Sequence, residues 1–226
     1  MKRVLLTCIG FLALQAVHAG SISGIVRARG KDGAGDATGG GNYESKSLKF
    51  AQRVDYDVMR DFVVYIKGPV AGAPAPVKVE QVVQKNATFI PRVLPVMVGT
   101  VVEWPNEDNI FHNVFSKSDA NRFDLDLYKK GDPAKKSPPF DKPGEVDVFC
   151  SIHARMSCII LVLENPYFAK TDGRGRYTIT NVPPGHYTLV AWQERLPNDT
   201  KEIIVPETGN LSGVDFTLGI KNLPKY

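Results

Sequence analysis

The chain has 226 residues, of which 43% are hydrophobic, and its 28 basic side chains stand against 24 acidic ones to give a net charge of +4. This composition is that of an ordinary globular protein with room for two modest domains. Because the charges nearly balance, the composition lacks the strong excess of basic residues that is typical of nucleic-acid-binding proteins. No apolar run is long enough for a confident membrane span.

The N-terminus has the three zones of a secretory signal peptide. Two basic residues precede an apolar run from Val4 to Val17, and the small residue Ala19 closes the segment. A charged, an apolar and a small-residue zone in this order predict a signal peptide over residues 1–19. We therefore expect an exported protein, periplasmic or secreted, whose mature chain begins near Gly20.

Seven short segments alternate between apolar and polar residues, and Gly, Pro or Asn punctuate them. Alternation with a period of two predicts β-strands, and short strands between frequent turn signals are typical of β-sandwiches. The fold class is therefore predicted to be all-β. The predicted strands are Ser21–Val26, Phe62–Ile66, Thr100–Trp104, Phe123–Tyr128, Glu145–Phe149, Tyr187–Trp192 and Val214–Leu218.

Three further segments lack this alternation. Only Lys46–Met59 has apolar spacings compatible with one face of a helix. The glycine-rich segment Gly30–Gly41 lacks the Lys-Ser/Thr pair of a phosphate-binding loop, so we interpret it as a flexible loop. Gly68–Pro76, rich in proline and alanine, is expected to be a linker.

Four potential metal ligands dominate the centre of the chain. Cys150, His153 and Met156 lie close together, and His112 lies upstream of them. A thiolate, two imidazoles and a thioether are the ligand set of a blue-copper electron-transfer site, although a structural zinc site could use the same side chains. The remaining histidine of the mature chain, His186, lies in a proline-rich turn, and we interpret it as an ordinary side chain.

The mature chain keeps two cysteines, Cys150 and Cys158. Two cysteines in an exported protein would ordinarily suggest a disulfide, but a bridge here would need the chain to fold back sharply within one short segment. We favour the alternative, in which Cys158 is a small buried apolar residue at the start of a strand.

The segment Ala87–Asn106, running into Asp108–Phe115, resembles the cupredoxins, especially the plastocyanin, pseudoazurin and amicyanin branch. In that family a Gly-Thr-hydrophobic-Trp-Asn strand precedes a His-Asn pair, and a strand ending in an aromatic residue precedes Cys, His and Met. The resemblance implies a Greek-key β-sandwich over residues 77–163. It also implies one type 1 copper held by four ligands, which would be His112, Cys150, His153 and, at the axial position, Met156.

Two details of the implied site depend on neighbouring residues. The resemblance places Asn113 where it could hydrogen-bond the backbone near Cys150. Only two residues separate His153 from Met156, fewer than plastocyanin-like members usually have. The carbonyl of a residue near Phe111, or an open position, could therefore take the place of the axial thioether.

The flanks resemble the carboxypeptidase regulatory-like, transthyretin-type β-sandwich. Ser21–Arg27 and Phe62–Gly68 look like its opening strands, and Lys170–Leu189 looks like its later strands with an Asn-Val-Pro-Pro-Gly-x-Tyr turn. This implies a second, smaller sandwich split over residues 20–70 and 164–226, with the cupredoxin inserted between its strands. A longer cupredoxin followed by an independent C-terminal domain is the alternative. Chains of this combined form resemble exported proteins labelled methylamine-utilisation or plastocyanin-like.

The resemblance implies an exported type 1 copper protein that carries single electrons between transient redox partners, such as a dehydrogenase or a cytochrome, and that is not an enzyme. The mature chain has too few histidines for the catalytic copper of a multicopper oxidase or nitrite reductase. Electrons would leave through His153, with Ala154 and Arg155 at the docking surface. The lysines between Lys129 and Lys142 are either a solvated loop or a docking patch for an acidic partner. The alternative function is a non-catalytic binding or copper-storage module.

Overall fold

The computed structural model is all-β, which confirms the predicted fold class: every regular element of the described residues is a strand. The structure describes residues 19–30, 55–76, 79–207 and 209–220. The predicted signal peptide lies outside these residues apart from its last position. Most of the predicted helix Lys46–Met59 lies outside them too, and its described end, Asp55–Met59, forms a turn. Within the described residues, no helix is long and apolar enough to cross a bilayer.

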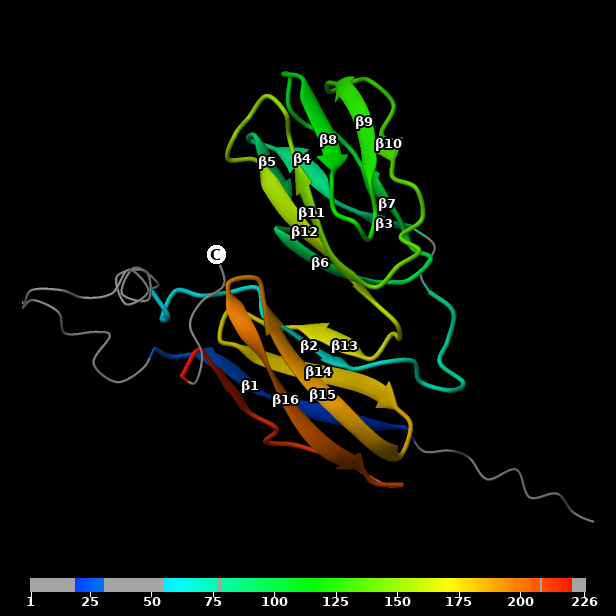
Figure 1. Ribbon diagram of the computed structural model, residues 1–226, viewed down its shortest axis with the longest axis vertical. Coiled ribbons are helices and arrows are strands. Elements are labelled where there is room, and N and C mark those ends of the chain that lie inside the picture. The colour runs from blue at the N-terminus through cyan, green and yellow to red at the C-terminus, as the bar shows by residue number, and fades with distance from the viewer. Residues whose placement is uncertain (1–18, 31–54, 77–78, 208, 221–226) are drawn as a thin grey trace, which may run out of the picture.

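Ten strands from the middle of the chain form the upper group in Figure 1. A five-stranded sheet in the order β6-β12-β11-β8-β9 faces a three-stranded sheet in the order β10-β7-β3, beside the hairpin β4-β5. Trp104, Phe140 and Val148 are buried between the sheets. The strands are β3 (Val79–Gln81), β4 (Val83–Lys85), β5 (Thr88–Ile90), β6 (Val93–Met97), β7 (Val101–Trp104), β8 (His112–Ser116), β9 (Phe123–Tyr128), β10 (Lys135–Lys136), β11 (Gly144–Phe149) and β12 (Ser157–Leu163).

Strands from both ends of the described chain form the lower group in Figure 1. β1 pairs antiparallel with β14 and parallel with β17, and β2 lies between β13 and β15 in a second sheet that ends at β16. Strands that are far apart in the sequence therefore share one core, while the domain boundaries stay a prediction. The strands are β1 (Gly20–Ala28), β2 (Val63–Ile66), β13 (Phe168–Lys170), β14 (Arg176–Val182), β15 (Gly185–Gln193), β16 (Leu196–Val205) and β17 (Phe216–Leu218).

β12 joins the two groups because it is buried on both faces. Cys158, Ile160 and Val162 belong to the core of the upper group. The alternate residues Ile159, Leu161 and Leu163 pack with Val63 and Trp192 of the lower group. An apolar run such as Ile159–Leu163 is expected for a strand covered on both sides.

Polar contacts reinforce this shared interface at its edges. The Trp192 indole N–H donates to the Glu145 carboxylate at 2.6 Å, the Arg92 guanidinium lies 2.6 Å from the Glu194 carboxylate, and the Lys170 ammonium donates to the Val93 carbonyl at 3.2 Å. Each contact links a residue of the upper group to a residue of the lower group. On the upper side these contacts involve β11, β6 and the residue before β6, which belong to the sheet that contains β12.

Candidate metal centre

The loop between β11 and β12 carries three of the four predicted ligands. Its ends are closed by the antiparallel pairing of Phe149 with Ser157. Inside the loop, the Cys150 N–H donates to the Met156 carbonyl at 3.1 Å, and the Met156 N–H donates to the His153 carbonyl at 2.9 Å. These backbone bonds make residues 150–156 a compact turn, which explains how so short a spacing can be accommodated.

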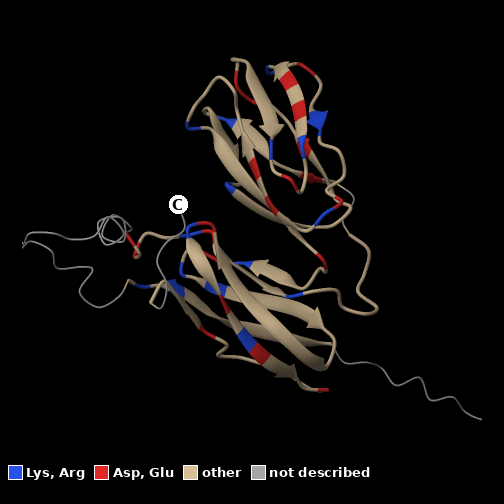
Figure 2. Cartoon of the chain, viewed as in Figure 1, with Lys and Arg blue, Asp and Glu red and all other residues tan. Residues whose placement is uncertain are grey.

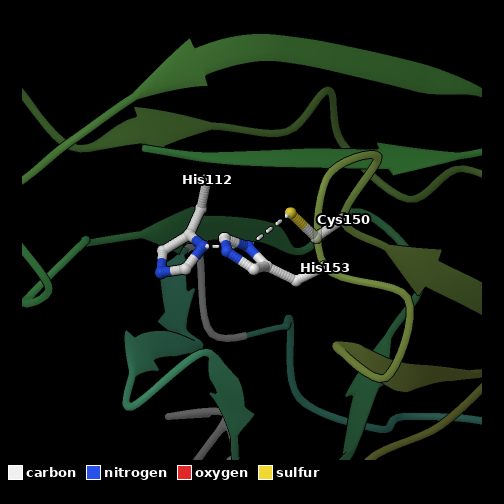
Figure 3. A group of neighbouring side chains, drawn as sticks. All are labelled: His112, Cys150 and His153. Carbon is white, nitrogen blue, oxygen red and sulfur yellow. Dashed lines mark hydrogen bonds between the residues drawn. The ribbon is translucent and has the colours of Figure 1, made fainter. Parts of the chain in front are cut away.

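The fourth predicted ligand, His112, is the first residue of β8 and reaches the loop because β8 is the neighbour of β11. Figure 3 shows the two imidazoles and the thiol pointing toward one another. The Nδ1 atoms of His112 and His153 lie 3.0 Å apart, and the Cys150 sulfur lies 3.6 Å from the His153 Nδ1. The ligand atoms of the three residues all lie within 4.8 Å of one another.

This donor set determines which ions the site suits. A thiol and two imidazole nitrogens are donors that both copper and zinc accept in proteins. His112 is fully buried and Cys150 is buried, whereas His153 is partly exposed. The site therefore has a protected interior and one imidazole that reaches the surface.

The Cys150 sulfur accepts a hydrogen bond from the backbone N–H of Asn113 at 3.4 Å. Hydrogen bonds to a ligand atom orient it for metal binding. The contact differs from the expected one, because the acceptor is the sulfur and not the backbone near Cys150. The Asn113 side chain instead donates to the Asp124 carboxylate at 2.7 Å.

Asp108, for which the sequence predicts no role, contacts the other side of His112. Its Oδ2 lies 2.8 Å from the His112 Nε2, and the backbone N–H groups of Asn86 and Ala87 donate to its two oxygens at 2.8 and 2.9 Å. Burial would raise the pKa of Asp108, but the hydrogen bonds from Ala87, His112 and Asn86 outweigh it and lower that pKa. The only sequence signal is an acidic residue four positions before a histidine.

Solved cupredoxins resemble part of this chain. A purple cupredoxin from Nitrosopumilus maritimus is 24% identical, over 36% of this chain and 97% of its own, with a TM-score of 0.32. A copper-containing nitrite reductase from Thermus scotoductus is 33% identical, over 43% of this chain and 25% of its own, with a TM-score of 0.36. Amicyanin from Paracoccus versutus is 22% identical, over 44% of this chain and 96% of its own, with a TM-score of 0.34.

A different family matches the C-terminal part of the chain. Residues 164–211 match domain II of polysaccharide lyase family 4. No curated protein matches the sequence. The matched residues include none of the four predicted ligands, and the carboxypeptidase regulatory-like identity of this region stays a prediction.

The structure separates the two cysteines. Cys150 and Cys158 are both free thiols, so the disulfide alternative is wrong and Cys158 is a buried residue of β12, as favoured. Burial raises the pKa of the Cys158 thiol, which keeps it protonated and unreactive. Met156 is 1% exposed and lies in the same core cluster as Cys150, while its role as the axial ligand stays a prediction. His186 is exposed on β15 and does not join the cluster of ligands.

Two of the lysines between Lys129 and Lys142 lie near acidic side chains, while the docking-patch alternative stays a prediction. Lys135 and Lys136 lie 4.0 Å from Asp126 and 3.6 Å from Glu103, respectively. Basic and acidic residues are interspersed along the strands of both groups (Figure 2). Lys129 differs, because its ammonium lies 5.3 Å from the centre of the Phe111 ring, directly before His112 in the sequence.

Proposed function

We propose that the chain is a type 1 copper protein that carries single electrons between redox partners. One observation carries this proposal: a thiol and two imidazole Nδ1 atoms converge at one end of a β-sandwich, with their ligand atoms within 4.8 Å of one another. A cysteine and two histidines are the core of a blue-copper site. The cupredoxin resemblance of the sequence supports the same conclusion.

The ligands would be the Nδ1 atoms of His112 and His153 and the sulfur of Cys150. Copper bound there would supply a reversible one-electron change, which neither imidazole nor thiol supplies alone. The β-sheet would keep the donor atoms in fixed positions, because His112 is the first residue of β8 and Cys150 directly follows β11 in the same sheet. Met156, next to these donors in the sequence and in the core, is our proposal for the axial position.

His153 offers the route to a partner because its ring is partly exposed. Around it, Ile152 is 51% exposed, and Ile110 and Phe111, which precede His112, are 49% and 48% exposed. Exposed apolar residues grouped at a site mark interaction surfaces, and electron-transfer contacts are small and transient. Lys129 beside Phe111 adds positive charge, so we propose a redox partner with an acidic rim, such as a dehydrogenase or cytochrome.

The proposal includes export and the lack of catalysis. The N-terminal segment resembles a secretory signal, so we place the protein in the periplasm or outside the cell. We propose a carrier rather than an enzyme because the described ligands form a single cluster. Mass spectrometry of the exported protein should find a chain that begins near Gly20, and an uncleaved N-terminus would contradict export by this route.

Copper titration of the purified mature protein tests the proposal. Cu(II) should produce an intense visible thiolate-to-copper band that disappears in Cys150→Ser and persists in the matched variant Cys158→Ser, whose thiol lies in β12. A colourless protein, or a metal that is indifferent to Cys150→Ser, would contradict the proposal. Zinc binding without affinity for copper would point to a structural site. Bound copper that exchanges no electrons would point to the storage alternative.

A further inference from the structure

We propose that Asp108, fixed by the turn between β4 and β5, is a positioning residue that makes Nδ1 the metal-binding nitrogen of His112. The inference rests on the proposed function, since it concerns how the copper ligand is prepared. It concerns a property of the metal-free protein, however, and can be measured without copper.

The turn between β4 and β5 has an uncommon backbone. Asn86 and Ala87 connect the two strands, and their φ angles are 54° and 52°. Positive φ at both central residues is the conformation of a type I′ hairpin turn, which asparagine tolerates and which glycine usually fills at the second position. Alanine pays a steric cost for this conformation, because its Cβ approaches the backbone. Such strain persists where the surroundings determine it.

The Asp108 carboxylate accepts hydrogen bonds from the backbone of this turn. The Asn86 N–H donates to Oδ1 at 2.8 Å, and the Ala87 N–H donates to Oδ2 at 2.9 Å. The backbone of Asp108 is held as well: its N–H donates to the Asn106 side chain at 2.8 Å, and its carbonyl accepts the Lys130 N–H at 3.1 Å. The carboxylate therefore has a fixed position and a fixed direction.

A carboxylate with this environment decides which nitrogen of His112 carries hydrogen. An ionised carboxylate only accepts, and its Oδ2 lies 2.8 Å from the His112 Nε2, so Nε2 must be the donor. A neutral imidazole has one N–H, which leaves the His112 Nδ1 with a bare lone pair. That lone pair faces the His153 Nδ1 at 3.0 Å, on the side of the Cys150 thiol.

Asp108 is the partner of the Nε2 side of the His112 ring. The side chain is fully buried, so water does not replace Asp108 as the acceptor. Without the carboxylate, the ring could place its hydrogen on Nδ1, where it would block metal binding. Hydrogen-bond partners of this kind orient metal-ligating histidines and set their tautomer.

Nitrogen-15 NMR of the metal-free protein at pH 8 tests the inference directly. Wild-type His112 should be protonated at Nε2 and bare at Nδ1. Asp108→Ala should lose this preference and weaken Zn²⁺ binding, measured by competition with a chromophoric chelator, by about 10- to 100-fold. Ala87→Gly keeps the N–H donor and should keep the wild-type tautomer and affinity.

Glu107→Gln is the matched control, because it removes a carboxylate one position away. The Glu107 carboxylate pairs instead with the ammonium of Lys85, on β4 of the same hairpin, at 2.8 Å. The inference is overturned if wild-type His112 carries its hydrogen on Nδ1, whether or not any variant folds. It is also overturned if Asp108→Ala keeps the Nε2–H form and binds Zn²⁺ as Glu107→Gln does. A missing copper band with the Nε2–H form intact would instead refute the proposed function alone.

Discussion

Replacement of Trp192 by alanine should destabilise the metal-binding group of strands, although this residue belongs to the other group. Trp192 lies on β15, is 1% exposed, and packs against Ile159, Leu161 and Leu163 of β12. If the shared cluster joins the two groups, a cavity at Trp192 weakens β12, and β12 carries the end of the ligand loop. Loss of the side chain should then lower the stability of both groups together.

The magnitude follows from the burial of the indole. Replacing a fully buried tryptophan by alanine costs about 3–5 kcal/mol. In a protein of this size each kcal/mol shifts Tm by about 2–4 °C, so Tm should fall by about 6–20 °C. The exposed residue Ile204, at 61% exposure on β16, provides a surface control. Ile204→Ala should change stability by no more than about 0.5 kcal/mol.

The two tryptophans of the chain provide the assay. Trp104 is fully buried in the upper group, so in any Trp192 variant the tryptophan fluorescence reports that group alone. Trp192→Phe retains an aromatic ring and serves as the matched single-tryptophan reference. Heating followed by fluorescence and by circular dichroism should show one shared, lowered midpoint in Trp192→Ala. An unchanged Trp104 midpoint, together with a shifted dichroism midpoint, would refute the coupling of the two groups.

Three further predictions concern the site and its surroundings. Met156→Leu conserves side-chain volume, so it should lower the free energy of unfolding by less than about 1.5 kcal/mol. If the Met156 thioether is the axial ligand, the same change should shift the reduction potential of the copper. An unchanged potential would favour a carbonyl near Phe111, or an open position, at the axial site. Lys129→Glu should slow electron exchange with an acidic partner and weaken the dependence of this rate on salt. Lys142→Glu is the control, and an equal effect of this variant would indicate a general effect of net charge instead of docking at Lys129. Burial is the main cause that raises the pKa of Asp147, and the charge of Glu145 raises it further. Because the folded state then binds the proton more tightly than the unfolded state, the free energy of unfolding should fall as pH rises from 3.8, the ordinary pKa of the group, through the raised pKa. Asp147→Asn should remove this slope in denaturant titrations, and an unaltered slope would contradict the assignment.

Sequence periodicity predicted β11, whose residues alternate between a buried and an exposed face, and also β2, which is buried on both faces. Phe123–Tyr128 corresponds in full to β9, and the predicted Glu145–Phe149 lies within β11. β16 was missed because most of its residues are polar or exposed, and its strand conformation comes from the hairpin pairing with β15. β12 alternates between two cores rather than between core and solvent, so its pattern showed no period of two.

The candidate ligands could be proposed because their chemistry is local. Cys150 and His153 lie on one loop, and His112 was found through the family resemblance of its strand. The role of Asp108 could not be predicted, because it depends on the N–H groups of Asn86 and Ala87, which another hairpin brings to the carboxylate. Contacts between backbone donors and a distant side chain have no sequence signature of their own.

Voltammetry of the copper-loaded mature protein tests the central claim most directly. The proposed carrier should give one reversible one-electron wave, which is absent from Cys150→Ser and present in Cys158→Ser. The assignment of this protein as an electron carrier would be contradicted if mass spectrometry finds one equivalent of bound copper but voltammetry shows no such wave. A wave that persists in Cys150→Ser would contradict it as well.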